Sequence, residues 1–215
     1  GEIARKGLVI KVGVLELQGG YALHHSLLKR IGLRSMAVKT VDDLSEVQGL
    51  ILPGGESTTM SILMNNYNIR ESIIKFANHN PVLGTCAGLI LMCKDVNDKR
   101  LEPISLLDVS ISRNAYGRQI HSSKKKIHVL IDQENKMEIA STFIRAPIIQ
   151  HIGKNIDIIA KQDNQPVAIL SKNHLGLTFH PEIDNIGIFH KMMFDSSSKF
   201  YFKKLKYGHA TQNSF

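Results

Sequence analysis

The sequence predicts an α/β fold: a mixed, mainly parallel sheet flanked by helices, with added antiparallel strands in the second half of the chain. In the first half, short apolar runs typical of buried strands alternate with segments of helical periodicity. In the second half, strand-like runs follow one another with few helices between them. A length of 215 residues and an apolar content of 43% are enough for a sizeable core.

The first half is predicted to alternate regularly between strands and helices. We expect strands at residues 8–15, 35–39, 49–52 and around Val82, and helices at 21–31, 42–46, 57–64, 70–79 and 87–93. Each predicted helix connects two strands, which is the pattern of a parallel sheet with helices on both faces. Glycine and proline mark several of the boundaries, as in the Pro-Gly-Gly that follows residue 52.

The second half is predicted to be mostly strand. We expect strands at residues 106–112, 126–131, 139–144, 156–161, 167–170 and 174–179. Strands joined without a helix favour antiparallel neighbours. Since no repeat, linker or low-complexity segment divides the chain, residues 1–215 are predicted to form one domain, with a core from about 8 to 207 and a polar tail.

The composition argues against several classes of function, namely nucleic-acid binding, membrane association and metal binding. The net charge is +8, but the lysines are scattered, and their clusters at 124–126 and 203–206 lack interleaved aromatic residues. We therefore expect solvated surface, or secondly a partner surface, and no nucleic-acid binding. No apolar stretch approaches the roughly 20 residues of a membrane helix, so no membrane partner is expected. The His, Cys and acidic residues lack metal-ligand spacing, which predicts neither a metal nor another cofactor.

The two cysteines, Cys86 and Cys93, have different predicted roles. Both are placed on one predicted helix, about two turns apart, which is too far for a disulfide. We expect Cys93 to be a small core residue. Few cysteines and no plausible bridge are typical of a reducing compartment, so a cytoplasmic location is predicted.

Cys86 is the middle residue of Gly-Thr-Cys-Ala-Gly at 84–88, directly after a short apolar run. This is the pattern of a nucleophile elbow, in which a buried strand turns sharply into a helix. The flanking glycines suit a bend that would be crowded by side chains. The N-terminus of the following helix favours a thiolate over a thiol. The motif therefore predicts an acyl-transfer enzyme with Cys86 as its nucleophile.

A base and an orienting group are expected near the far end of the chain. His180 follows a predicted strand in Phe-His-Pro-Glu at 179–182, and Pro181 restricts the backbone between His180 and Glu182. We predict that His180 is the general base and acid, and that Glu182 orients and stabilises its imidazole. This is the logic of the Ser-His-Asp triad with two members exchanged.

Two backbone amides are predicted to bind the oxyanion. Ala87 N–H follows the nucleophile directly, and Gly55 N–H lies in the Pro-Gly-Gly-Glu-Ser loop at 53–57. Both segments follow strands of a parallel sheet, so they are expected at the same carboxyl edge. The alternative for the second loop is an ordinary strand–helix turn with Ser57 as the helix N-cap.

Six segments together resemble one enzyme family. They are Leu-Glu-Leu-Gln-Gly at 15–19, Leu-Pro-Gly-Gly-Glu-Ser-Thr-Thr-Met at 52–60, the elbow at 84–88, Arg-Asn-Ala-Tyr-Gly-Arg-Gln at 113–119, Phe-Ile-Arg-Ala-Pro at 143–147 and Phe-His-Pro-Glu at 179–182. Over roughly residues 12–190, the chain resembles the glutaminase subunits of pyridoxal 5′-phosphate synthase (the YaaE/SNO family), within the class I glutamine amidotransferases. The elbow and His-Pro-Glu are shared by the whole class, whereas the Gly-Gly-Glu-Ser-Thr-Thr, Arg-Asn and Ile-Arg-Ala-Pro segments are specific to the family.

The resemblance implies a flavodoxin-like fold and a definite reaction. L-glutamine would be hydrolysed to L-glutamate and ammonia, and the ammonia passed to a synthase partner that is a (β/α)₈ barrel. By this resemblance the glutamine contacts are Gly55, Glu56, Ser57, Arg113, Ile144 and Arg145, and Gln18 lies near the oxyanion loop and the partner interface. The resemblance also implies low activity alone, with one oxyanion N–H misdirected until the partner docks.

The α-carboxylate of glutamine needs a cation, for which Arg113 and Arg145 are both candidates, and its α-ammonium needs Glu56 or the Ile144 carbonyl. The sequence leaves these choices open. Two other functions also remain as alternatives: the glutaminase subunit of another amidotransferase, such as the histidine-pathway one, and a non-catalytic regulatory subunit.

Overall fold

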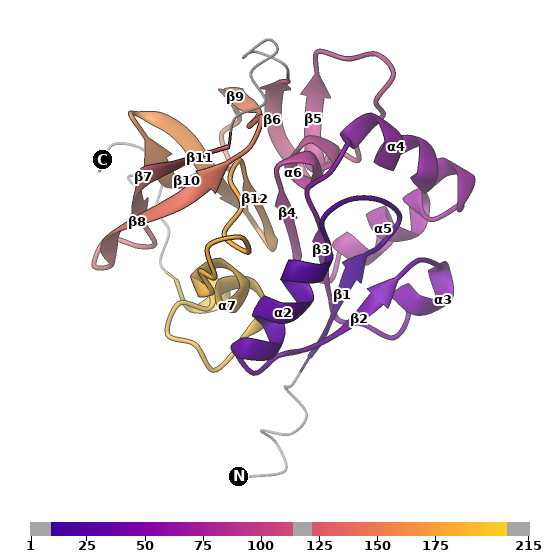
Figure 1. The fold of residues 1–215 in the computed structure, drawn as a ribbon, viewed down its shortest axis with the longest axis horizontal. Coiled ribbons are helices and arrows are strands. Elements are labelled where there is room, and N and C mark those ends of the chain that lie inside the picture. Colours follow the sequence, from indigo (N-terminus) through magenta and orange to yellow (C-terminus); the bar gives the residue numbers. More distant parts are fainter. Residues whose placement is uncertain (1–9, 114–121, 206–215) are drawn as a thin grey trace.

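A nine-stranded sheet runs through the molecule in the order β2-β1-β3-β4-β12-β11-β10-β7-β8 (Figure 1). The computed structural model describes residues 10–113 and 122–205. The parallel half consists of β2 (Arg34–Val38), β1 (Lys11–Leu15), β3 (Gly49–Leu52), β4 (Val82–Thr85) and β12 (His174–Leu177). The antiparallel half adds β11 (Gln165–Ser171), β10 (Asp157–Gln162), β7 (Ser123–Leu130) and β8 (Lys136–Phe143). The predicted mixed α/β sheet, parallel first and antiparallel later, is confirmed.

Helices cover both faces of this sheet. They are α2 (Ala22–Arg30), α3 (Val41–Leu44), α4 (Ser57–Asn66), α5 (Arg70–Ala77), α6 (Ala87–Met92) and α7 (Ile188–Phe194), followed by the short 3₁₀ helix η1 (Phe202–Lys204). Helices α3 to α6 pack on one face and contribute to one apolar cluster, whereas α2 and α7 contribute to the cluster on the other face. Figure 1 shows α2 and α7 side by side, and Arg30 at the end of α2 donates to Asn185 just before α7.

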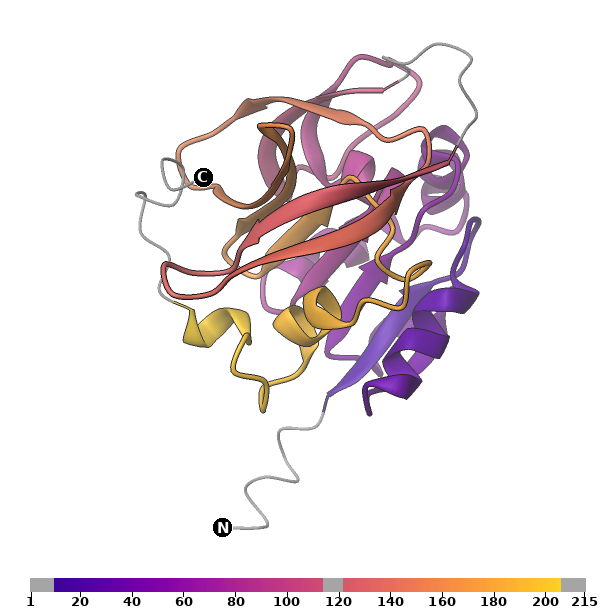
Figure 2. The same cartoon turned by 60° about the vertical axis from the view of Figure 1, so that its left-hand side comes forward.

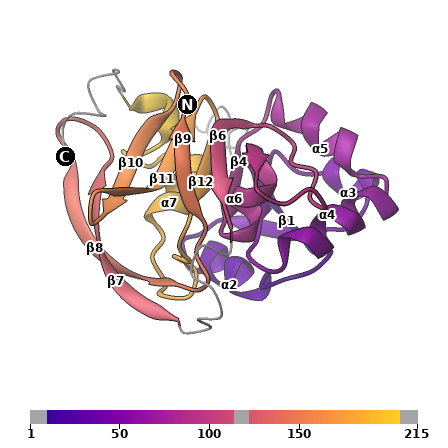
Figure 3. The same cartoon turned by 90° about the horizontal axis from the view of Figure 1, so that it is seen from above.

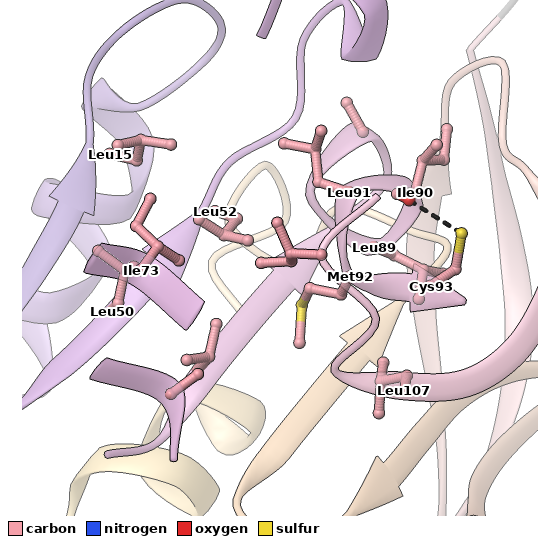
Figure 4. Close-up of a cluster of buried hydrophobic side chains, with 14 of the residues drawn as sticks. Leu15, Leu50, Leu52, Ile73, Leu89, Ile90, Leu91, Met92, Cys93 and Leu107 are labelled. Atoms are coloured by element: carbon pink, nitrogen blue, oxygen red, sulfur yellow. Dashed lines mark hydrogen bonds between the residues drawn. The ribbon is translucent and has the colours of Figure 1, made fainter. Parts of the chain in front are cut away.

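The core follows from the alternation of side chains along the strands. In β3, Leu50 and Leu52 point into the cluster under α4 to α6, while Ile51 points into the cluster under α2 and α7. Figure 4 shows the first cluster, where Leu52 lies between Leu50 and the side chains of Leu89 and Met92 from α6. All five side chains are fully buried. The apolar runs predicted as strands are therefore buried on both faces, as expected for parallel strands between helices.

A second, three-stranded sheet corrects two sequence predictions, the end of the helix at 87–93 and the placement of Cys93 on that helix. It consists of β5 (Cys93–Val96), β6 (Leu107–Ser112) and β9 (Ile148–Ile152), and Figure 3 shows β6 beside β9. The helix predicted at 87–93 ends at Met92, so Cys93 begins a strand and does not share a helix with Cys86. The Cys93 thiol donates to the Ile90 carbonyl at 3.0 Å (Figure 4).

Strand β9 was not predicted, because polar Gln150 and His151 interrupt its short apolar run. It forms only because β6 provides a partner from elsewhere in the chain.

The antiparallel half curls over the carboxyl edge of the parallel half. His180, three residues past β12, pairs with Thr142 of β8 in an isolated antiparallel bridge. Figure 2 shows the β7–β8 hairpin crossing in front of the sheet. The end of β8 and the segment after it are thereby brought against the loops that follow the parallel strands. In the described residues no helix is long and apolar enough to cross a membrane. That residues 1–215 form one domain stays a prediction.

Candidate active site

Cys86 lies on a strained turn between β4 and α6. Its backbone has φ 52° and ψ −105°, a region that residues with a side chain rarely adopt. The turn is held from outside, because the Cys86 amide donates to the Leu177 carbonyl of β12 at 2.8 Å. The thiol is mostly buried and lies 3.6 Å from the carbonyl oxygen of Ile144. The predicted strand–turn–helix geometry is therefore present at Cys86.

The two glycines of the elbow, Gly84 and Gly88, allow α6 to pack closely on the strands beneath it. A Cβ on Gly88 would overlap the backbone carbonyl of Leu52 in β3. A Cβ on Gly84 would lie 2.7 Å from the carbonyl carbon of Gly88. Helix α6 thus packs directly on the strands beneath it, with no space for a side chain at either position. The sequence predicted crowding at the bend. The structure shows that the contact between α6 and the sheet is crowded as well.

His180 and Glu182 are hydrogen-bonded as the sequence suggested. His180 Nδ1 lies 2.7 Å from Glu182 Oε1, and both residues are buried. The His180 amide donates to the Thr142 carbonyl at 2.9 Å, which fixes the loop against β8. A Cβ on Gly54 would lie 2.5 Å from His180 Cε1, so the glycine loop packs on the imidazole. Glu182 and the glycine loop thus hold the ring, and β8 holds the backbone of His180.

The surroundings of His180 favour its charged form. Burial disfavours the charge, but hydrogen bonds and attraction from Cys86 and Glu182 outweigh burial and raise the pKa of His180 to about 10. At neutral pH the imidazole is therefore an imidazolium that faces both the thiol and the carboxylate. A cationic neighbour of this kind is what a reactive thiolate requires.

The glycine loop is fixed by the segment that follows β1. The Gly20 amide donates to the Gly54 carbonyl at 2.9 Å, and the Glu56 amide donates to Gln18 Oε1 at 2.9 Å. In a trans peptide the N–H points opposite to the carbonyl, so the Gly55 N–H points away from Gly20. Gln18 thus lies against the predicted oxyanion loop, where a Cβ on Gly55 would be 2.5 Å from its amide oxygen.

Arg113 is clamped by four side chains. Its Nη1 donates to Ser57 Oγ at 2.6 Å and to Thr58 Oγ1 at 2.8 Å. Its Nη2 lies 3.5 Å from Glu56 Oε1 and 3.4 Å from Asp98 Oδ2. The side chain is 12% exposed, so the guanidinium is held at the wall of the site rather than free in solvent. The rest of that sequence segment, residues 114–119, lies outside the described part of the chain.

Glu56, rather than Ser57, caps helix α4. Its carboxylate accepts from the amides of Thr58 at 3.2 Å and Thr59 at 2.7 Å. Burial disfavours its charge, but the bonds from Thr59 and Thr58 and the attraction of Arg113 outweigh burial and lower the pKa of Glu56. The alternative with Ser57 as N-cap is therefore wrong, since a carboxylate with two oxygens reaches two free amides at the positive helix end.

One cavity of about 360 Å³ joins these groups. A cavity of this size suits a small molecule such as an amino acid. The predicted site residues on its wall are Gly55, Glu56, Ser57, Cys86, Ala87, Arg113, Ile144, Arg145, His180 and Glu182. Other lining residues were not predicted: Gly20, Leu23, Gly54, Ile90 and Ile183. Gln18 lies beside the cavity, one residue from Gly19, which packs against Gly54.

Sequence reasoning missed two groups behind this wall. One is His24, which is fully buried although its neighbour His25 on the same helix is only partly buried. Adjacent helical residues diverge by about 100°, so one of two neighbours readily faces inward while the other faces outward. Asp98, which binds Arg113, was missed because it lies in a polar loop with no motif. Among the described residues no group of three or more His, Cys, Asp and Glu could hold a metal ion.

Residues 14–197 match the model of the SNO glutamine amidotransferase family. The chain belongs to this family. A relative from Solibacter usitatus (strain Ellin6076), named pyridoxal 5′-phosphate synthase subunit PdxT, is 40% identical over 185 residues, covering 85% of this chain and 96% of the relative. A relative of the same name from Thermoplasma volcanium is 42% identical over 180 residues, covering 81% of this chain and 88% of the relative. The resemblance found in the sequence is confirmed.

Solved structures agree with the SNO assignment. One described as a glutamine amidotransferase has a TM-score of 0.78 at 32% identity, covering 85% of this chain and 96% of that one. A glutamine amidotransferase from Thermotoga maritima has a TM-score of 0.56 at 14% identity, covering 96% of this chain and 90% of that one. At that identity the second structure supports the fold alone.

Proposed function

We propose that this chain is the glutaminase subunit of a pyridoxal 5′-phosphate synthase. It hydrolyses L-glutamine to L-glutamate and ammonia through a thioester on Cys86, and the ammonia is used by a synthase partner. The observation that carries the proposal is the meeting of Cys86, His180 and Glu182 at one cavity, with His180 Nδ1 2.7 Å from Glu182. Family membership and the names of the relatives support the choice of substrate and pathway.

In the first half of the reaction, the Cys86 thiolate attacks the side-chain amide carbon of glutamine. The electrons of the carbonyl bond move to oxygen, and the amides of Gly55 and Ala87 stabilise the resulting oxyanion. The imidazolium of His180 gives its proton to the departing nitrogen, and the C–N bond breaks to release ammonia. The raised pKa of His180 supports this role, because the proton is present before the attack.

In the second half, the acyl group is released from the sulfur. Neutral His180 takes a proton from water, the hydroxide attacks the thioester carbon, and a second oxyanion forms in the same place. The C–S bond then breaks, giving the Cys86 thiolate and a side-chain carboxylic acid that loses its proton to solvent to become glutamate, while His180 retains the proton taken from water. Glu182 keeps the imidazole oriented through both halves.

The groups on the wall support binding of a zwitterion. The Ile144 carbonyl faces the thiol, where it accepts from Cys86 at 3.6 Å, and is our preferred acceptor for the α-ammonium. Glu56 is less suitable for the α-ammonium, because its carboxylate already caps α4 and pairs with Arg113. Arg113 and Arg145 remain the two candidates for the α-carboxylate.

A synthase partner is part of the proposal. The relatives are named as subunits, which supports a hetero-oligomer, and we propose that the partner is a (β/α)₈ barrel. The exposed apolar side chains of Leu23 (49% exposed) and Ile183 (42% exposed) line the cavity, which supports docking next to it. Gln18, bound to the oxyanion loop, is the proposed site of activation. No nucleic-acid or membrane partner and no cofactor is proposed, and the cytoplasmic location stays a prediction.

Replacing the nucleophile tests the proposal directly. We expect Cys86→Ala to abolish glutamate release from glutamine, with and without a barrel synthase, while its melting temperature stays close to that of the wild type. Cys93→Ala is the matched control, because Cys93 is a buried thiol outside the cavity, and it should retain glutaminase activity. Glutamate release by folded Cys86→Ala would refute the thioester mechanism.

The two alternatives predict different outcomes. A glutaminase of the histidine pathway would be stimulated by its own cyclase and not by a pyridoxal phosphate synthase barrel. A regulatory subunit would release no glutamate with any partner. Membership of the SNO glutamine amidotransferase family favours the proposed role in pyridoxal 5′-phosphate synthesis over these two alternatives.

A further inference from the structure

Two buried histidines lie behind the proposed triad. His24 of α2 and His190 of α7 are both fully buried, and His24 Nδ1 lies 2.9 Å from His190 Nε2. The other ring nitrogen of His24, Nε2, lies 3.7 Å from Glu182 Oε1. That oxygen is the one that lies 2.7 Å from His180 Nδ1. A continuous chain of polar groups therefore leads from His190 through His24 to the triad carboxylate.

His24 also faces the strand that carries the nucleophile. Its Nε2 lies 3.4 Å from Oγ1 of Thr85, the residue that precedes Cys86. The surrounding face of the sheet is otherwise filled by apolar side chains from α2 and α7. Polar rings in such a place are costly unless they are hydrogen-bonded, so their contacts with each other and with Glu182 account for their presence.

Both rings are neutral at physiological pH. Burial lowers the pKa of His24 to about 3, although the attraction of Glu182 opposes this shift, and nearby His190, His180 and His25 add to it. Burial likewise lowers the pKa of His190 to about 3. His24 therefore faces Glu182 Oε1 at 3.7 Å as a neutral polar ring, in a contact longer than a hydrogen bond, and not as a cation that would compete with His180 for the carboxylate.

The positions of the protons follow from the unpaired atoms. His190 Nδ1 is buried and has no hydrogen-bond partner among the described residues. Because buried N–H groups without an acceptor are rarer than unfilled acceptors, the proton of His190 belongs on Nε2, where it is donated to His24 Nδ1. A neutral His24 then carries its own proton on Nε2, which faces Glu182 Oε1 and Thr85.

We propose that His24 and His190 are positioning residues that hold the Glu182 carboxylate in place for His180. The proposal rests on the function proposed above. Within the described residues Glu182 Oε2 has no hydrogen-bond partner, so Oε1 makes the recorded contacts of this carboxylate. A polar N–H next to Oε1 holds the carboxylate against His180, and a carboxylate held there favours the imidazolium that faces Cys86.

Three substitutions of His24 test this arrangement. In His24→Gln the amide nitrogen reaches about as far as Nε2 and keeps a polar N–H next to Glu182 and Thr85. In His24→Leu the donor is lost, and in His24→Asn the shorter amide keeps the contact with His190 but does not reach the carboxylate. His25→Leu is the matched control, because His25 is the next residue of α2 and contacts Ser35 and Glu16 instead.

The first measurement is the rate of Cys86 alkylation by iodoacetamide across pH, which needs no substrate. Burial raises the pKa of Cys93 to about 12, so Cys86 is the thiol that reacts. We expect His24→Leu and His24→Asn to lower the alkylation rate near neutral pH by about tenfold, since a less well positioned imidazolium supports the reactive thiolate less. His24→Gln and His25→Leu should follow the wild-type profile.

The second measurement is the glutaminase rate with the synthase partner present. His24→Leu and His24→Asn should lower kcat about tenfold with KM nearly unchanged, because a Glu182 carboxylate that is less well positioned orients His180 less well. His24→Gln should remain within about threefold of the wild type. Melting curves identify the variants that fold. If His24→Leu does not fold, the comparison of His24→Asn with His24→Gln tests the proposal.

Two outcomes would overturn the proposal. One is a wild-type alkylation profile in folded His24→Leu or His24→Asn, and the other is equal impairment of Asn and Gln, which would indicate packing instead of hydrogen bonding. Absence of glutamate release by the wild type with its partner would refute the proposed function instead. The alkylation profiles would still test the positioning role in that case.

Discussion

Glu182 shows how much a single carboxylate decides at this site. It accepts from His180 at 2.7 Å, and the contacts of His180 with Cys86 and with this carboxylate together raise the pKa of the imidazole to about 10 in spite of burial. The acid therefore sets both the direction and the charge of the catalytic ring. A neutral side chain of the same shape would retain the geometry and remove the charge.

Glu182→Gln is accordingly expected to lower kcat by roughly 10²- to 10⁴-fold while the fold is retained. The pH profile of kcat should also change, because the imidazolium of His180 will lose its proton at a lower pH than in the wild type. Steady-state glutamate release measured from pH 6 to pH 10 tests both effects. A variant with an unchanged kcat and an unchanged profile would show that Glu182 does not act on His180.

At the scale of elements, the reactive cysteine depends on how closely α6 lies on β3. Gly88 contacts the Leu52 carbonyl through its backbone, and Gly84 contacts Gly88, so the helix sits directly on the sheet. The strained turn at Cys86 is compensated by the hydrogen bond of its amide to Leu177. The position of the sulfur is therefore set by packing between elements as much as by the turn.

Gly88→Ala should disturb this contact, because the added methyl group overlaps backbone and not a flexible side chain. We expect a loss of roughly 1–3 kcal/mol in the free energy of unfolding and a larger proportional loss of glutaminase activity, since α6 must lift and carry Cys86 with it. Chemical denaturation and glutamate release measure the two. Gly20→Ala is the control for the free energy of unfolding alone, because a Cβ there meets no atom within 4 Å but Gly20 lines the cavity. Wild-type stability and activity in Gly88→Ala would contradict the packing argument.

On the scale of the whole molecule, buried histidines link stability to pH. Burial lowers the pKa of His24 and His190 to about 3, and burial also lowers the pKa of His174. Between pH 3 and 6.5 the unfolded chain binds protons that the folded chain excludes, so stability falls as the pH drops below 6.5. His180 acts in the opposite range, because its raised pKa makes stability fall as the pH rises from 6.5 towards 10.

The free energy of unfolding should therefore be greatest near pH 6.5–7. Below this range each buried neutral histidine adds a slope of about 1.4 kcal/mol per pH unit. Urea denaturation at pH 5, 6 and 7 measures this slope, above the range in which the carboxylates titrate. His190→Phe should reduce the slope if it folds. Equal stability at pH 5 and 7 would contradict the linkage.

Local patterns in the sequence determined much of the fold and the chemical groups of the site. Alternation of strands and helices indicated the parallel half, and the Gly-Thr-Cys-Ala-Gly motif identified the elbow, because both signals are encoded in neighbouring residues. His180 and Glu182 were found for the same reason, since two residues joined by a proline need no distant partner to meet. The resemblance added Arg113, Ile144 and Arg145, which line the same cavity.

Contacts between distant residues decided the rest. Strand β9 forms because β6 is beside it. Asp98 meets Arg113, and His24 meets Glu182, only after the strands are assembled. A sequence specifies a residue's chemistry and its local periodicity, whereas burial and long-range partners exist only in the folded chain. The buried histidine pair behind the triad belongs to this second category.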